Sequence, residues 1–298
     1  MKKKNHLQKD IVNYTFILPA AIFIIVFMFY PIVYNIIMSF KDVTISNLVN
    51  GSQEFIGLEN FKSIFRDMYF RNSIKNTFVF MFFCLSFQLI FGFLFAMYFN
   101  KKFKGSRWMR AILLVAWMNP IVITGTIFKW FLAGDGGIVN YVLMHVGLIN
   151  SLINFLASPT TALGSVIFAN IWVGIPFNMI ILLSGLQNIP EELYESAAID
   201  GAGKIAQLRH ITLPMMKSTI TVLILLGFIY TFKVFDIIYA MTGGGPANAS
   251  QILPYYAYEL SFKVFKFGQG AAASTISFLI IAVLAVVYVY IAKKEDVG

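Results

Sequence analysis

Side chains that could do acid–base, nucleophilic or metal chemistry are few and scattered in this chain of 298 residues. The three histidines, His6, His145 and His210, lie far apart and do not have the spacing of a zinc site. The single cysteine, Cys84, excludes an internal disulfide and a cysteine-based metal cage. Asp236 is the one carboxylate within a long apolar stretch, whereas an intramembrane aspartyl protease needs two. We therefore expect no catalytic residue and no bound metal or other cofactor.

A nucleotide site is not expected either, although one stretch superficially resembles a phosphate-binding loop. Gly201-Ala-Gly203-Lys204 matches the end of GxxxxGK[ST], but the earlier glycine is missing and Ile205 replaces Ser or Thr. Gly201, Gly203 and Ala206 also fit the loose dinucleotide fingerprint. That fingerprint requires a preceding strand, and here it falls in a helical loop between apolar stretches. The chain is therefore not expected to hydrolyse ATP by itself.

Polar residues inside apolar stretches are the remaining candidates, because a charge in lipid is costly. Lys233 and Asp236 are three residues apart and would share one face of a helix. They form either a structural pair near the membrane surface or part of the border of a path for a polar solute. The stretch 172–178, WVGIPFN, interrupts another apolar segment, and its Gly and Pro predict a kink or a close helix approach.

Six long apolar stretches carry these residues. Hydrophobic residues make up 58% of the chain and charged residues 12%, against about 45–50% and about 25% in soluble domains. A soluble fold of this size could not bury so much apolar surface, so the surrounding solvent must be lipid. We predict an all-α, polytopic membrane protein, with one transmembrane domain over 1–298 and six spans at about 14–38, 75–99, 109–132, 162–184, 217–240 and 271–292.

The positions of the basic residues predict the orientation of these spans. Four precede span 1, five lie between spans 2 and 3, three lie between spans 4 and 5, and two follow span 6, which is 14 of the 23 Lys and Arg residues. The positive-inside rule makes this side cytoplasmic, with both termini inside. This clustering also favours membrane topology over nucleic-acid binding as the origin of the net charge of +9.

Two segments complicate the span count. The N-terminal Met1-Lys-Lys-Lys4 resembles the start of a signal peptide, but the apolar part that follows is too long, which favours an uncleaved anchor. Segment 138–157 is apolar enough to suggest a seventh span. A seventh span would place the Lys/Arg-rich loops on opposite sides, and asparagines interrupt the segment. We therefore interpret it as short helices at the outer interface.

The cytoplasmic loop 186–216 is longer than a connection between two spans requires. Asn188 can cap a first helix that holds Pro190 and Glu191 in its first turn, and Gly201 can end it. Acidic side chains near the start of this helix suit the positive end of its dipole. A small-residue patch in the middle, Ser-Ala-Ala, permits another surface to approach closely.

The second half of this loop predicts another short helix at about 203–210, and Pro214 marks the entry into span 5. Two interpretations stand side by side on physical grounds. The segment is either a solvated amphipathic connector or a double-helix elbow that docks onto a cytoplasmic partner.

Three segments of the chain resemble a known family. Glu195-Ser196-Ala197, Gly201 and Ile211-Thr-Leu213-Pro214 have the spacing of the EAA motif of binding-protein-dependent ABC importer permeases, with Ser196 where Ala is usual. Phe55-Ile-Gly57-Leu58-Glu-Asn60-Phe61 resembles a segment of the first outer loop in the maltose-type, or carbohydrate uptake, permeases. Met241-Thr242-Gly243-Gly244-Gly245-Pro246 resembles their loop after span 5.

The resemblance implies a permease subunit in a bacterial cell membrane that imports a sugar or oligosaccharide. It implies a second, similar permease, two cytoplasmic ABC ATPases that hold ATP and Mg, and an extracytoplasmic solute-binding protein that contacts the glycine-rich loop. The elbow would dock onto an ATPase through Glu191, Glu192, Tyr194, Glu195, Ser196, Ala197, Ala198, Asp200, Gly201 and Ala202.

The resemblance also implies where the solute passes. The wall of the path would include Gly174, Phe177, Asn178, Tyr230, Thr231, Val234 and Asp236. Core packing is the competing interpretation for the two aromatic residues. A stand-alone channel or secondary carrier is the alternative from another class, and an amino-acid or phosphate permease is the alternative within the family.

Overall fold

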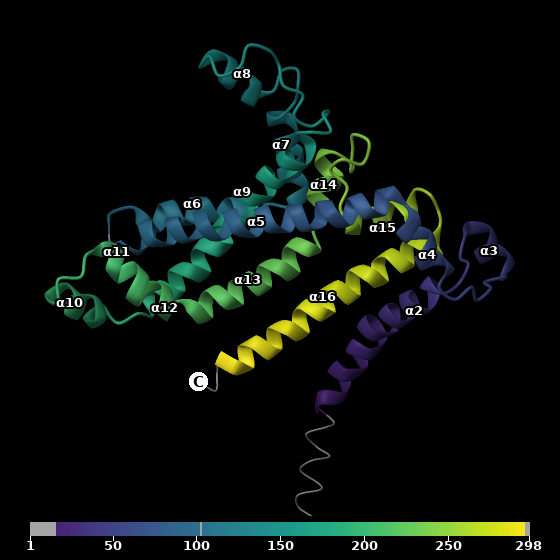
Figure 1. Ribbon diagram of the computed structural model, residues 1–298, viewed down its shortest axis with the longest axis horizontal. Helices are drawn as coiled ribbons and strands as arrows, with labels where there is room; N and C mark the ends of the chain where they lie inside the picture. The colour runs from purple at the N-terminus through teal and green to yellow at the C-terminus, as the bar shows by residue number, and fades with distance from the viewer. Residues whose placement is uncertain (1–15, 102, 296–298) are drawn as a thin grey trace, which may run out of the picture. The chain divides into compact units, whose positions relative to one another are not determined.

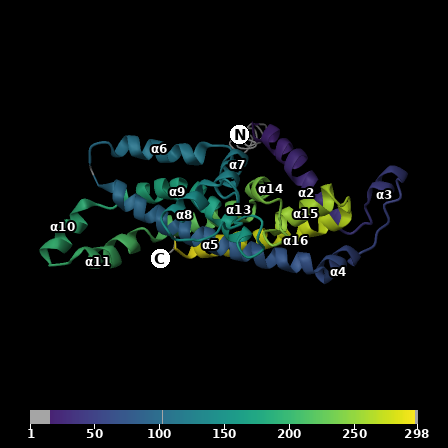
Figure 2. The same ribbon diagram turned by 90° about the horizontal axis from the view of Figure 1, so that it is seen from above.

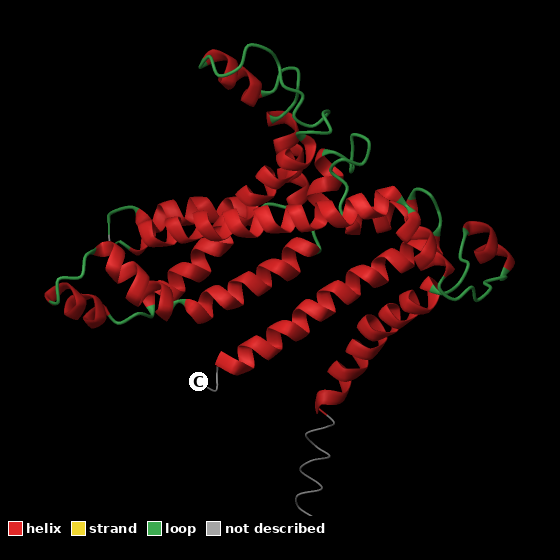
Figure 3. Cartoon of the chain, viewed as in Figure 1, coloured by secondary structure: helices red, strands yellow, loops and turns green. Residues whose placement is uncertain are grey.

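The computed structural model describes residues 16–101 and 103–295. In this part of the chain the structure consists of helices and connecting loops, with two isolated β-bridges and no strand (Figure 3). The predicted all-α fold is therefore confirmed. Five basic residues that support the orientation prediction lie outside the described residues, namely Lys2, Lys3, Lys4, Lys9 and Lys102. Residues 14–15 of the predicted first span also lie outside them.

Four helices are long and apolar enough to cross a membrane. They are Phe16–Ser39, α5 (Met68–Asn100), α9 (Ala162–Gln187) and Phe267–Tyr288, the last within α16 (Phe267–Glu295). Two further helix pairs are apolar enough, but one is bent by 95° and the other by 65° at a short break. When each bent pair is counted as one span, the described residues contain up to six candidate spans by length and composition, and the second pair includes residues 204–215, which lie outside the predicted fifth span.

The predicted third span, 109–132, is broken near its middle. It consists of α6 (Ser106–Met118) and α7 (Ile121–Phe131), which meet at 95°. Pro120 causes the break, because its ring disfavours the helical conformation of the residue before it, and Asn119 is extended with ψ of 140°. Pro120 directly precedes α7, where its missing N–H leaves no helical hydrogen bond unmade.

The predicted fifth span, 217–240, ends early. Helix α13 (Lys217–Phe232) stops before Lys233, and α14 (Asp236–Met241) starts after a three-residue break. The break places Lys233 at the negative end of one helix dipole and Asp236 at the positive end of the next, which stabilises both termini. The prediction that these two side chains share a helix face is therefore wrong. Both are exposed, and in the described part of the chain no ion pair joins them.

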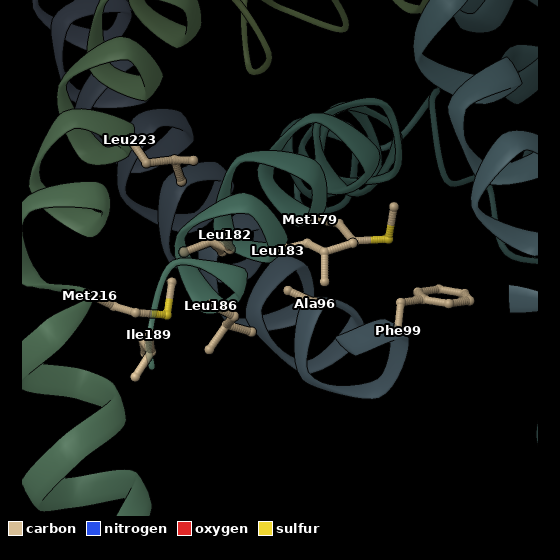
Figure 4. Close-up of a cluster of buried hydrophobic side chains, with 9 residues drawn as sticks. All are labelled: Ala96, Phe99, Met179, Leu182, Leu183, Leu186, Ile189, Met216 and Leu223. Atoms are coloured by element: carbon tan, nitrogen blue, oxygen red, sulfur yellow. The ribbon is translucent and has the colours of Figure 1, made fainter. Parts of the chain in front are cut away.

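The described residues fall into two compact units, of which the larger comprises residues from 68 to 256 and from 278 onward. Helices α5, α9 and α13 lie side by side in it (Figure 1). In its core, Leu182 and Leu186 of α9 lie between Ala96 of α5 and Met216, which directly precedes α13, and all four are buried (Figure 4). This apolar packing fixes the relative positions of the three helices.

Segment 138–157 contains one short helix, α8 (Ile138–His145), followed by loop, so it does not form a seventh span. Asn140 holds this excursion together, and its side chain is 1% exposed. Its Nδ2 donates to the carbonyls of Ala133, Gly134 and Ile153, and its Oδ1 accepts from the N–H of Ile153. The asparagine that interrupts the apolar pattern is therefore the residue that folds the segment back.

The smaller unit comprises residues up to 67 and from 257 to 277. It holds η1 (Ile25–Phe29), α2 (Tyr30–Ser39), α3 (Ile45–Asn50), α4 (Glu59–Arg66), the end of α15 (Leu253–Phe262) and the start of α16. Asn60 of the first-loop motif is buried, and its Nδ2 donates to the carbonyls of Ser39 and Lys41 at 2.9 and 2.8 Å. Gly268 lies against the same amide, where a Cβ would come within 2.8 Å of it. The motif thus ties α4 to the chain after α2.

Candidate functional site

A cavity of about 300 Å³ lies within the larger unit, between α5, α9, α13 and the break that separates α6 from α7. Three of these helices come together because the core described above holds them. The cavity is lined by Gln88, Trp117, Ile121, Asn170, Val173, Gly174, Phe177, Asn178, Leu223, Gly227, Tyr230, Thr231 and Val234.

Six of the seven residues predicted for a solute path line this cavity. They come from two segments far apart in the sequence, 174–178 on α9 and 230–234 at the end of α13. Asp236 is not among the lining residues, because the break after α13 carries it onto the next helix. The structure thus brings the predicted residues together except for their one carboxylate.

One wall of the cavity is aromatic. The rings of Trp117 and Phe177 stack with centroids 5.5 Å apart, and Phe177 meets Tyr230 edge-on at 6.2 Å. Tyr230 is 57% exposed, and Lys233 Nζ lies 5.7 Å from the centre of its ring. Phe177 and Tyr230 pack against each other and also line the cavity. The exposed ring faces can stack on the C–H groups of a polar solute.

The cavity is also lined by polar, uncharged side chains. Gln88, Asn170, Asn178 and Thr231 are all at least nine-tenths buried, and among the thirteen lining residues none is acidic or basic. The Nδ2 of Asn178 donates to the carbonyl of Gly174 at 2.8 Å. Amides and a hydroxyl in an apolar surround can both donate to and accept from hydroxyl groups of a ligand.

Glycines permit this close packing of α5 against α9. A Cβ on Gly174 would overlap the carboxamide of Gln88, and one on Gly92 would lie 2.7 Å from Cβ of Asn178. The predicted close approach at the WVGIPFN stretch is therefore confirmed. The helix α9 itself continues through Pro176.

Gln88, Asn170 and Trp117 line the cavity but were missing from the sequence-based set. The first two could have been found, since each is an amide inside an apolar span, and polar residues in spans mark solute pathways. No feature of the sequence indicated that Trp117 lines a cavity. Tryptophan near a span end is common for membrane anchoring alone.

The predicted elbow begins with α10 (Glu191–Ile199). Its end is a Schellman motif: Gly201 has φ of +83°, its N–H donates to Ala198, and the N–H of Ala202 donates to Ala197. The predicted helix end at Gly201 is confirmed. The predicted cap at Asn188 is wrong, because Asn188 keeps a helical conformation as the last turn of α9 and Pro190 precedes the new helix.

The second arm of the elbow is one continuous helical stretch, longer than predicted. It consists of α11 (Lys204–Gln207), η2 (Leu208–Thr212) and α12 (Leu213–Met215), and it meets α13 at 65°. The π-helical turn η2 ends two residues before Pro214, whose missing N–H interrupts the regular pattern of helical hydrogen bonds.

Side-chain contacts hold the two arms together. The hydroxyls of Tyr194 and Thr212 are 3.0 Å apart, and Nε2 of Gln207 donates to the carbonyl of Ala202 at 3.2 Å. Tyr194 and Ile211 also pack against the apolar core of the larger unit. Tyr194 thus faces inward, which distinguishes it from most of the predicted docking residues.

The outer surface of the elbow is mostly accessible. Seven of the ten predicted docking residues are exposed, and Tyr194, Ala197 and Ala202 are half-buried. Ile199 and Ile205, which the sequence did not indicate, are 88% and 83% exposed at the tips of the two arms. Figure 2 shows α10 and α11 at one end of this unit, away from α7 and α14. An exposed apolar pair on a rigid elbow is typical of a contact surface.

The glycine-rich loop after α14 is anchored to α5. The hydroxyl of Ser250 donates to the carbonyl of Gly245 at 2.6 Å, which closes the loop on itself. Nδ2 of Asn76 donates to the carbonyls of Ala249 and Gln251, both at 3.0 Å. Gly244 has φ of +78°, and a Cβ there would collide with the ring of Tyr255. The loop is therefore a fixed surface.

Comparison with known proteins identifies a family over most of the chain. Residues 88–296 match the family described as "Binding-protein-dependent transport system inner membrane component". The trehalose/maltose transport system permease protein MalF of Thermococcus litoralis is 32% identical over 94% of this chain and 93% of its own. The sulfoquinovosyl glycerol transport system permease protein SmoG of Agrobacterium fabrum is 33% identical over 93% of this chain and 89% of its own.

A solved structure supports the same fold. A chain of a bacterial ABC transporter involved in the import of the acidic polysaccharide alginate superposes with a TM-score of 0.84. It is 25% identical and covers 99% of both chains.

Proposed function

Because the chain belongs to the family of binding-protein-dependent transport system inner membrane components, we propose that it imports a neutral saccharide through the cavity on α5, α9 and α13. It is a membrane permease subunit and not an enzyme. The observation that supports a saccharide as the solute is the combination of aromatic rings and uncharged polar side chains in the lining of one cavity. Sugars present C–H faces and hydroxyl groups, which such a lining matches.

The cavity supplies only part of the pathway. Its volume of about 300 Å³ is at the lower end of the ~300–1,000 Å³ of small-molecule sites. Tyr230 and Trp117 on its aromatic wall are 57% and 47% exposed, so the wall continues to the surface. A second permease packed over these rings would enclose the solute.

The elbow is the proposed contact with one of two ABC ATPases, which bind ATP and Mg. Its exposed apolar tips at Ile199 and Ile205 offer contact area, and its connection to the core through Tyr194 offers a rigid link to α13. ATP-driven movement of the ATPases would thereby reach the helix that lines the cavity. The elbow then lies in the cytoplasm, and both termini are cytoplasmic.

An extracytoplasmic binding protein is the proposed source of the solute. The glycine-rich loop is held rigidly at the start of α5, and its tip residue Ala247 is exposed in a left-handed conformation, with φ of 47°. A strained, exposed and well-anchored tip is typical of a recognition surface.

Reconstitution tests this function. The chain, purified with its partner subunits, is placed in liposomes and given the binding protein and labelled maltose, trehalose, phosphate or an amino acid. We expect uptake of a neutral saccharide that stops when ATP is omitted. If uptake continues unchanged without ATP, the protein is a channel or secondary carrier. Uptake of phosphate or an amino acid alone would contradict the saccharide assignment.

A further inference from the structure

Gln88 occupies an unusual position among the polar residues that line the cavity. It is 6% exposed, and its Nε2 donates to the backbone carbonyl of Asn170 on the facing helix at 2.9 Å. Its carboxamide lies against Gly174, where a Cβ would overlap its Cδ, Nε2 and Oε1. Hydrogen bonding on one side and packing on the other therefore hold the carboxamide in place.

These contacts determine which end of the carboxamide faces the cavity. A backbone carbonyl can only accept a hydrogen bond, so the NH₂ group of Gln88 must face Asn170 and Oε1 must lie at the other end. Within residues 16–101 and 103–295, Oε1 of Gln88 has no hydrogen-bond partner, whereas every fully buried side-chain oxygen and nitrogen has one. Oε1 is therefore accessible, and the cavity is the space that Gln88 lines.

We propose that Gln88 is a specificity-determining residue, whose Oε1 accepts a hydrogen bond from one hydroxyl group of the saccharide in the cavity. This inference rests on the proposed function. The carboxamide is already immobilised, so binding costs it little further conformational entropy. An analogue without that hydroxyl displaces water from Oε1 and leaves the oxygen unpaired, which is the arrangement that discriminates most strongly between substrates.

A purely structural role is the competing explanation, and Asn35 provides the matched control. Its Nδ2 donates to the carbonyl of Ala271 at 3.4 Å and to Oγ1 of Thr275 at 3.2 Å, so it also joins two helices. Asn35 does not line the cavity. Loss of a helix-joining amide alone would affect Asn35 and Gln88 variants alike.

The first experiment needs no saccharide. In the assembled transporter carrying Cys84→Ser, a cysteine at Gln88 should react with methanethiosulfonate ethylammonium, because the cavity admits water. A cysteine at Ala96, two turns further along α5 and fully buried in the apolar core, should not react. Equal protection of both cysteines would overturn the inference.

The second experiment measures selectivity. Uptake of maltose, trehalose and their monodeoxy analogues is compared in the parent, Gln88→Met and Asn35→Leu, all with the same binding protein. For the saccharide carried, one monodeoxy analogue should be about fivefold slower in the parent, the equivalent of one net hydrogen bond. Gln88→Met should abolish this difference, and Asn35→Leu should keep it. Gln88→Asn, which withdraws the oxygen by one methylene, replaces Gln88→Met if that variant does not assemble.

The outcomes separate the two proposals. If Gln88→Met still takes up the monodeoxy analogue more slowly than the saccharide, as the parent does, Gln88 only joins α5 to α9 and the inference is wrong. The proposed function then stands. If the parent carries no saccharide at all, the proposed function fails and the inference fails with it.

Discussion

Substitution of Gly174 by alanine should weaken the contact between α5 and α9. The new Cβ would overlap all three outer atoms of the Gln88 carboxamide, which cannot move away without giving up its bond to Asn170. Overpacking of this kind costs about 1–3 kcal/mol and a lost hydrogen bond about 1 kcal/mol, against a gain of roughly 0.5–1 kcal/mol from replacing a helical glycine. We expect a net loss of ~2 kcal/mol in the free energy of unfolding.

Gly164 on the same helix is the matched control. No atom outside its own helix lies within 4 Å of a Cβ built there, so Gly164→Ala should stabilise the protein by roughly 0.5–1 kcal/mol. Reversible unfolding in detergent micelles measures both changes. In a Gln88→Ala background the obstacle is gone, so Gly174→Ala should cost little. Equal stability of the Gly174→Ala and Gly164→Ala proteins would refute the proposed contact.

Three further predictions concern the elbow, segment 138–157 and the orientation. Gly201→Asp forces a side chain into a φ of +83° on the proposed docking surface, so ATP-driven uptake should fall strongly with membrane insertion unchanged, whereas Gly203→Asp, at a φ of −70°, should be tolerated. Asn140→Ala removes four hydrogen bonds, so amides in 133–153 should exchange with solvent faster in hydrogen-exchange measurements, while the exposed Asn150→Ala should not change them. A single cysteine at Asn50 should react with an impermeant thiol reagent added outside cells, and one at Gly203 should not; the reverse pattern would overturn the orientation.

The sequence by itself determined the all-α membrane fold class and the family. Each of these depends on local properties: apolar stretches long enough to cross lipid, and motifs whose spacing lies within one loop or span. Gly201 is a clear case, since a glycine after a helical run predicts a left-handed helix end without knowledge of any neighbour. The wrong prediction at Asn188 shows where local sequence is insufficient. Asn188 lies between two helices, and the sequence does not decide whether it ends the first or caps the second.

The tertiary structure decided where the spans break and which residues meet. No proline or glycine lies in the break after Phe232, so the sequence does not indicate it, and the break moves Asp236 away from the cavity that Tyr230 and Thr231 line. The pairing of Gln88 with Gly174 joins residues 86 positions apart, and only the approach of two helices brings them together. Hydropathy reports how strongly a segment prefers lipid, but it carries no information about the neighbouring helix. The cavity therefore follows from helix packing, which the pattern along one chain does not encode.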